Sequence, residues 1–149
     1  YGLKGEVSDE YFEVEIGKAM IRKQGTDVTL VSYGHGMPMI EKAQEELQKK
    51  DIDAEVIDLR SLNPLDLETI ISSVQKTGRL LLLDTARKTG GVMAEVAASV
   101  QSESGDYLDG PIIRVGSEDV PWPYSRKLEQ HAMASVPKII KALEIGYSL

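Results

Sequence analysis

Apolar residues along the chain gather in short, nearly continuous runs. The runs cover residues 27–33, 54–59, 79–83 and 111–115 and are rich in Val, Ile and Leu. Short runs that are apolar throughout are typical of strands covered on both faces. The pattern therefore predicts four buried strands.

Between and after these runs, apolar residues recur at three- and four-residue spacing. These stretches cover residues 37–50, 64–74, 91–102 and 136–143, and the spacing places each apolar set on one helical face. In the second stretch, Asn63 is the expected N-cap and Pro64 the expected first helical residue. Strands and helices that alternate in this order indicate βαβ crossovers and a parallel sheet.

The first 26 residues differ from the rest. Residues 6–15 are acidic and polar like a linker, residues 16–23 fit a strand, and Gly25 makes a turn into the next strand. So short a turn joins antiparallel neighbours, which predicts one antiparallel strand on a mixed sheet. We interpret residues 1–15 as an inter-domain connector and residues 16–149 as one domain, cut from a longer chain because it starts at Tyr1.

Composition narrows the classes of function. The chain is 42% hydrophobic and 28% charged, as is typical of a soluble globular protein, and no apolar run approaches the roughly 20 residues of a membrane span. Its 17 basic and 24 acidic residues give a net charge of −7, which opposes binding to nucleic acid. The chain has no cysteine, and its two histidines, His35 and His131, lack metal-ligand spacing.

Two glycine-containing turns each follow a predicted strand and open a helix, where backbone N–H groups attract anions. Neither turn matches a dinucleotide-binding fingerprint or a P-loop. Tight backbone geometry also explains both turns, and we favour that structural interpretation. The candidate anion-site residues are Gly34, His35, Gly36, Thr89, Gly90 and Gly91.

Asp58 and Asp84 lie near the ends of predicted strands, where doubly wound folds place functional groups. Their expected role is to cap a helix or bind an arginine. No nucleophile with a partnered base is visible in the sequence. We therefore expect no catalytic residue, bound cofactor or metal ligand in this chain.

The only tryptophan of the chain, Trp122, lies between Pro121 and Pro123 and is followed by Tyr124. A rigid aromatic segment of this kind is a good interface element. The alternative is a loop whose tryptophan packs on its own domain.

Several segments, taken in order, resemble β subunits of 2-oxoacid dehydrogenase decarboxylases, in particular the pyruvate-dehydrogenase type. They are residues 1–7, 16–19, 25–31, 55–62, 64–66, 89–91 with 94–97, and 114–115 leading to 119–121. Residues 119–124 look most like pyruvate dehydrogenases, with acetoin and branched-chain 2-oxoacid dehydrogenases as close alternatives. The resemblance implies the transketolase C-terminal domain fold: a three-layer α/β/α sandwich on a five-stranded mixed sheet with one antiparallel strand.

The resemblance also implies that this chain does not catalyse alone. In such enzymes thiamine diphosphate and Mg²⁺ lie between the alpha subunit and the N-terminal domain of the beta subunit. The parent enzyme decarboxylates a 2-oxoacid, here pyruvate, and transfers the acyl group to lipoyl-lysine. The expected setting is the bacterial cytoplasm, with the mitochondrial matrix or a plastid as alternatives.

The partners implied by the resemblance are an alpha subunit, a second beta subunit and a dihydrolipoyl acyltransferase core, whose docking module is basic. Asp109 matches an acidic position that pairs with this module, and Trp122 and Tyr124 are further docking candidates. Two other classes stay open. One is the C-terminal domain of a transketolase or deoxyxylulose-phosphate synthase, and the other is a free-standing module that binds a small anion.

Overall fold

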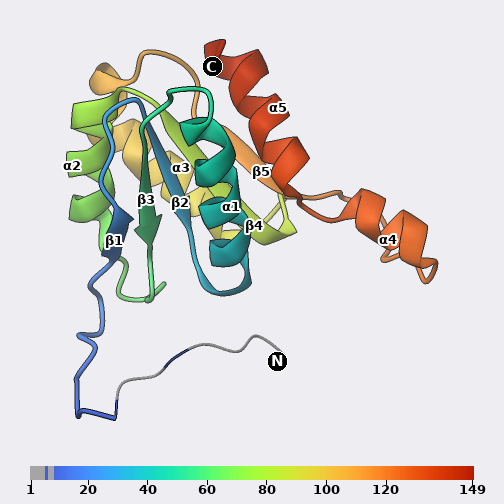
Figure 1. Ribbon diagram of the computed structural model, residues 1–149, viewed down its shortest axis with the longest axis horizontal. Helices are drawn as coiled ribbons and strands as arrows, with labels where there is room; N and C mark the ends of the chain where they lie inside the picture. Colours follow the sequence, from blue (N-terminus) through green and yellow to red (C-terminus); the bar gives the residue numbers. More distant parts are fainter. Residues whose placement is uncertain (1–5, 7–8) are drawn as a thin grey trace.

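A five-stranded sheet runs through the middle of the domain in this computed structural model, which describes residue 6 and residues 9–149 (Figure 1). The strand order is β1-β3-β2-β4-β5. Strands β2 to β5 run parallel, and β1 runs antiparallel to β3, which confirms the predicted mixed sheet. The strands are β1 (Met20–Lys23), β2 (Val28–Ser32), β3 (Ala54–Asp58), β4 (Leu80–Arg87) and β5 (Ile113–Ser117).

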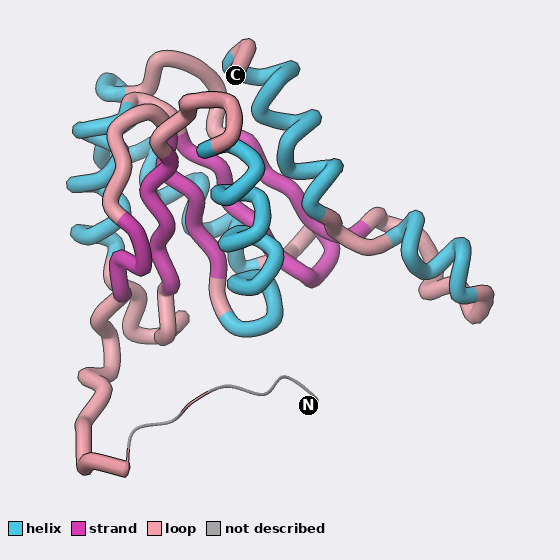
Figure 2. The backbone as a smooth tube through the Cα atoms, viewed as in Figure 1, coloured by secondary structure: helices cyan, strands magenta, loops and turns pink. Residues whose placement is uncertain are grey.

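Helices cover both faces of the sheet and complete the three-layer sandwich (Figure 2). Helices α1 (Met37–Gln48) and α5 (Val136–Tyr147) pack on one face. Helices α2 (Leu67–Thr77) and α3 (Val92–Ser104) pack on the other. The remaining pieces are two short 3₁₀ turns, η1 (Gly34–Gly36) and η2 (Gly105–Tyr107), and the short helix α4 (Arg126–Ala132).

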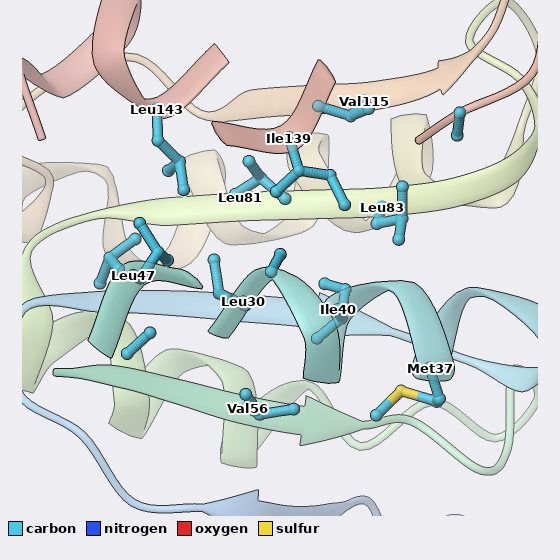
Figure 3. Packing of buried hydrophobic residues seen from close by; sticks show 14 residues of the cluster. Leu30, Met37, Ile40, Leu47, Val56, Leu81, Leu83, Val115, Ile139 and Leu143 are labelled. Atoms are coloured by element: carbon cyan, nitrogen blue, oxygen red, sulfur yellow. The ribbon is translucent and has the colours of Figure 1, made fainter. Parts of the chain in front are cut away.

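Strand β4 explains why the sequence shows continuous apolar runs rather than alternation. Its leucines at positions 80–83 are all fully buried. Leu81 and Leu83 point toward α1 and α5 (Figure 3), whereas Leu80 and Leu82 belong to the cluster beneath α2 and α3. Successive side chains of a strand face opposite layers, so a strand between two helical layers is apolar at every position.

The antiparallel strand β1 pairs with β3, not with the strand that follows it in the sequence. The expectation that the antiparallel strand forms a hairpin with the strand that follows Gly25 is wrong, because β3 lies between β1 and β2. Residues 24–27 cross over the start of β3, where Thr26 and Asp27 both donate a backbone N–H to the Asp53 carbonyl at 3.0 and 2.9 Å. Four extended residues reach about 13 Å, and two strand spacings need only about 10 Å.

Gly25 is required by this crossing rather than by a turn conformation. A Cβ atom at this position would overlap the backbone of Ala54 and Glu55. A glycine inside a strand-like stretch often marks such a close approach of two backbones.

Helix α2 begins at Leu67 with Asp66 as its N-cap, so the predicted start at Asn63 and Pro64 is wrong. Residues 61–65 form a turn instead, in which the Ser61 hydroxyl donates to the Pro64 carbonyl at 2.7 Å. The Asp66 carboxylate accepts the Thr69 N–H, the Thr69 hydroxyl and the Ala19 N–H at 3.2, 2.8 and 2.9 Å. Burial raises the pKa of Asp66, but these donors outweigh it and lower the pKa overall.

Some boundaries also differ from the prediction. Strand β4 continues to Arg87, and β5 covers 113–117 rather than 111–115. Helix α4 was not predicted, because Ala132 is its only buried residue and the helix has no apolar stripe. No helix among the described residues is both long and apolar enough to cross a bilayer. Residues 1–5 and 7–8 of the predicted connector lie outside the described part, and residues 9–15 contain no helix or strand.

Candidate functional site

The carboxyl ends of β2 and β4 form the topological switch point of the sheet. From β2 the chain crosses to β3 on one side, and from β3 it crosses back to β4 on the other. Open α/β sheets bind ligands in the crevice at such a point. The two predicted anion-site turns, 34–36 and 89–91, follow these two strands and lie at this same edge.

The centre of this edge is a buried carboxylate. Asp84 in β4 is 3% exposed, and its Oδ1 accepts the Tyr33 hydroxyl and the Ala86 N–H, both at 2.9 Å. Gly91 stands on the other side of the carboxylate, where a Cβ atom would lie 3.2 Å from Oδ2. The structure thus brings Tyr33, next to the first turn, and Gly91, in the second turn, onto one acidic group.

Tyr33 is expected to titrate far above its ordinary value. Burial, followed by the hydrogen bond to Asp84 and its negative charge, raises the pKa of Tyr33 from 10.0 to about 12. Because the folded pKa lies above the unfolded one, the protonated Tyr33 hydroxyl contributes to the free energy of unfolding. That contribution is complete below pH 10 and is lost as the pH rises toward 12. Titration of ¹³Cζ-labelled tyrosines by NMR measures it. Asp84→Asn should lower the pKa, and a Tyr33 that titrates near 10.0 in the native protein would contradict the contact.

The surroundings of both turns disfavour an anion. The Thr89 hydroxyl already donates to the Asp119 carboxylate at 2.6 Å, and Asp84 lies between the turns. No cluster of three or more His, Cys, Asp or Glu that could hold a metal occurs within the described residues. Asp84 and Asp119 already accept hydrogen bonds from Tyr33 and Thr89, and their negative charge opposes a free anion at this edge.

The other aspartate at a strand end, Asp58, has a structural role. Its carboxylate accepts from the Arg22 guanidinium at 3.3 Å and from the Arg60 N–H at 3.1 Å. The Arg22 contact ties β1 to β3 and fits the predicted role of binding an arginine, whereas the Arg60 contact closes the local turn after β3.

Asp109 lies at the opposite end of the sheet, in the loop before β5. It is exposed, and its backbone N–H donates to the Gly78 carbonyl at 2.7 Å. Close by, the Tyr147 hydroxyl donates to the Pro111 carbonyl at 2.7 Å, and Arg79 lies over the Tyr147 ring at 5.9 Å. Burial raises the pKa of Tyr147, and the charge of Asp109 contributes to the increase. Asp109 is therefore an exposed charge on a firmly packed corner.

Trp122 and Tyr124 lie on an arm formed by residues 118–134, and α4 extends away from the body of the domain (Figure 1). Trp122 is half exposed and donates its Nε1–H to Glu129 at 3.2 Å, and Tyr124 is fully exposed. Val120, Pro121 and Leu128 line a hollow of about 390 Å³ on the arm. The arm follows β5, so it lies at the carboxyl end of the sheet, away from Asp109.

The predicted site residues therefore form three groups in space, with Asp109 apart from the other two docking candidates. The glycine turns meet around Asp84, Trp122 and Tyr124 share the arm, and Asp109 stands alone at the far end. The link between Tyr33 and Asp84 was missed, because the two residues are distant in the sequence. The available signal was the position of both residues at the ends of consecutive parallel strands on either side of the switch point.

Comparisons with known proteins agree with this architecture. Residues 17–139 match the family model "Transketolase, C-terminal domain". A solved chain titled "Split gene transketolase, inactive beta4 tetramer" superposes with a TM-score of 0.80 at 26% identity, covering 93% of this chain and 45% of that one.

Sequence relatives include "Pyruvate dehydrogenase E1 component subunit beta" of Rhizobium meliloti, 43% identical over 97% of this chain and 32% of the relative. The mitochondrial form of Saccharomyces cerevisiae is 44% identical over 97% of this chain and 41% of its own length. The Arabidopsis thaliana beta-1 form is 42% identical over 95% and 39%. This chain therefore spans only about two-fifths or less of these relatives, and it belongs to the transketolase C-terminal domain family.

Proposed function

We propose that this chain is the assembly and docking domain of a beta subunit in a thiamine-diphosphate-dependent 2-oxoacid dehydrogenase. Pyruvate is the proposed substrate of the parent enzyme, which decarboxylates it and passes the acetyl group to lipoyl-lysine. The proposed partners are an alpha subunit, a second beta subunit and a dihydrolipoyl acyltransferase core. Bacterial cytoplasm is the proposed setting, although the relatives include both bacterial and mitochondrial proteins.

One observation supports this proposal above the others. Relatives named as pyruvate dehydrogenase beta subunits align with 95–97% of this chain at 42–44% identity, yet the aligned part is 32–41% of their length. The chain thus spans less than half of each relative, which supports a contact role for this domain within a longer subunit.

Asp109 is the proposed contact for the acyltransferase core. Its exposed carboxylate stands on a corner whose backbone is held by Gly78 and Tyr147, so little backbone freedom is lost there when a basic partner binds. An exposed charge pair mainly speeds and orients docking, and salt weakens it. Trp122 and Tyr124 lie at the other end of the sheet, so we assign them to a different partner, the alpha subunit or the second beta subunit.

The test is a calorimetric titration of this chain with the isolated basic docking module of the acyltransferase, at low and high salt. Asp109→Lys should weaken binding roughly tenfold or more, equivalent to about 1.4 kcal/mol, and the loss should shrink at high salt. Asp106→Lys is the matched control, because Asp106 is an exposed acid three residues away, in η2. It should have a clearly smaller effect.

Sedimentation of the same samples gives the oligomeric state, since a second beta subunit is one of the proposed partners. If the folded, dimeric chain does not bind the module, the docking role is wrong. Equal losses in both variants would show that only net charge matters, and would remove Asp109 as the specific contact.

A transketolase is the second candidate for the parent enzyme. It is favoured by the solved split-gene transketolase chain, which shares the fold at a TM-score of 0.80. The sequence identity is lower there, 26% against 42–44% for the pyruvate dehydrogenase beta subunits. Specific binding of the acyltransferase module would exclude this candidate, because a transketolase has no acyl-transferring core to dock.

A further inference from the structure

The outer edge of strand β1 is open to another strand. Strand β1 ends the sheet and, within the described residues, pairs only with β3. Edge strands carry unpaired backbone N–H and C=O groups, which can pair with a further strand. Between β1 and α2 lies a hollow of about 420 Å³, whose lining includes Lys18, Ile21 and Ser72. The edge therefore has hydrogen-bonding groups to offer and room beside it for the side chains of an added strand.

The end of the connector has the pattern of a strand that lacks a partner. Phe12, Val14 and Ile16 are exposed apolar residues at every second position, with a glutamate after each of the first two. The Tyr11 hydroxyl donates to the Glu13 carboxylate at 2.6 Å, so these two side chains share one side, as in an extended chain. The segment thus has an apolar face and an acidic face, a pattern typical of half-buried strands.

The charges of the connector and of the β1 edge are opposite. Residues 9–16 contain four acidic residues and no basic one. The edge and the residues that lead to it carry Lys18, Arg22 and Lys23, and of these only Arg22 has an ion-pair partner among the described residues. Like charges on neighbouring strands destabilise their pairing, and opposite charges stabilise it. The edge therefore disfavours a second β1 strand and favours the acidic connector.

We propose that residues 11–16 of one copy of this chain add to the sheet of a second copy, at the outer edge of its β1. In such strand addition, backbone hydrogen bonds supply affinity, and alternate side chains supply specificity. The two copies exchange their connectors, so the same surface serves both and the assembly closes as a dimer.

The connector does not pair with β1 of its own chain but extends from the body of the domain (Figure 1). The residues between them are tied to the segment that leads into α2. The Ala19 N–H donates to Asp66 at 2.9 Å, and a Cβ atom at Gly17 would lie 2.7 Å from Pro64. In the exchange, the other copy's connector lies between, so about 10 Å must be crossed, and residues 16–20 reach about 13 Å.

This contact gives the proposed second beta subunit a surface and rests on that part of the proposed function alone. It does not involve Asp109, and its test needs no acyltransferase module. Failure of the connector exchange and failure of the docking role are therefore distinguishable.

The experiment is sedimentation velocity of the chain over a range of concentrations, with two charge-reversal variants. Glu13→Lys/Glu15→Lys reverses the connector, and Lys18→Glu/Lys23→Glu reverses the edge. Each variant alone should raise the dissociation constant of the dimer about tenfold or more at low salt, because repulsion replaces exposed charge pairs at both contacts. An equimolar mixture of the two should dimerise again, because each connector then meets an edge of opposite charge. Recovery in the mixture also shows that both variants fold.

Lys42→Glu/Lys141→Glu is the matched control, since it reverses two exposed lysines that line the hollow between α1 and α5. It should dimerise as the native chain does. A chain that stays monomeric at every concentration, or a dimer that both variants leave unchanged, would overturn the proposal. Amide hydrogen exchange adds a second readout, because protection of residues 11–16 should rise with concentration. Full protection in the monomer would also overturn the proposal, and would place the connector on the edge of its own chain.

Discussion

Replacement of Leu82 by alanine is expected to lower the free energy of unfolding by about 2–5 kcal/mol. Leu82 is fully buried in β4, where it pairs with β2 on one side and β5 on the other. Its side chain belongs to the cluster covered by α2 and α3, so truncation leaves a cavity that rigid neighbours cannot fill. Urea unfolding at 25 °C measures the change as a shifted midpoint at constant slope.

Two controls separate the cavity from other effects of mutation. Leu82→Met keeps the volume and should cost less than about 1.5 kcal/mol. Leu128→Ala removes the same atoms from the exposed face of α4 and should stay within about 0.5 kcal/mol of the native chain. If Leu82→Ala behaved like Leu128→Ala, the central position of β4 in the core would be wrong.

Lys76→Met is the second substitution with a large expected effect, about 3 kcal/mol of lost stability. Lys76 is the cation paired with Glu55, whose side chain is 1% exposed. Without it, the Gly25 N–H at 3.3 Å is the one remaining donor to the Glu55 carboxylate among the residues that the structure describes. The lysine itself is 39% exposed, so water reaches the pair and places the loss at the lower end of the range for buried ion pairs.

The double variant Glu55→Gln/Lys76→Met tests this reason directly. It removes the buried charge together with its partner, so it should be more stable than Lys76→Met alone. Lys49→Met, which breaks an exposed pair with Glu46, should change nothing measurable. A double variant that is no better than Lys76→Met would show that packing of the lysine stem, rather than charge, explains the loss.

The sequence predicted the strands best where both faces of a strand are buried, because every residue there must be compatible with the core. Strands β2 and β3 are buried at every position, and the apolar runs at 27–33 and 54–59 matched them closely. Strand β4 is buried only at its first five residues, and its predicted run ended within one residue of the end of that burial. Helix starts were less secure, because Asn63-Pro64 and Asp66 are both good local signals. The contact of Asp66 with the Ala19 N–H, which decides between them, joins residues far apart in the sequence.

The individual residues of the candidate site could be predicted from the sequence, but the sign of the charge at the site could not. The glycines at 34–36 and 89–91 were visible, and so was Asp84. Their meeting depends on β2 and β4 being neighbours, which the order of elements in the sequence does not determine. Once Tyr33 and Gly91 are placed on either side of Asp84, the charge of the site follows from the aspartate rather than from the helix that begins beside it.

The placement of β3 between β1 and β2 also determines which strand separates first from the sheet. Strand β1 is held by the ladder with β3 and by the ion pair between Arg22 and Asp58, and none of its residues belongs to either core cluster. Its amide protons should therefore exchange with solvent before those of β2 or β4, through an opening that leaves the core intact. That opening uncovers the edge of β3, whose free backbone groups can then accept the first strand of another molecule.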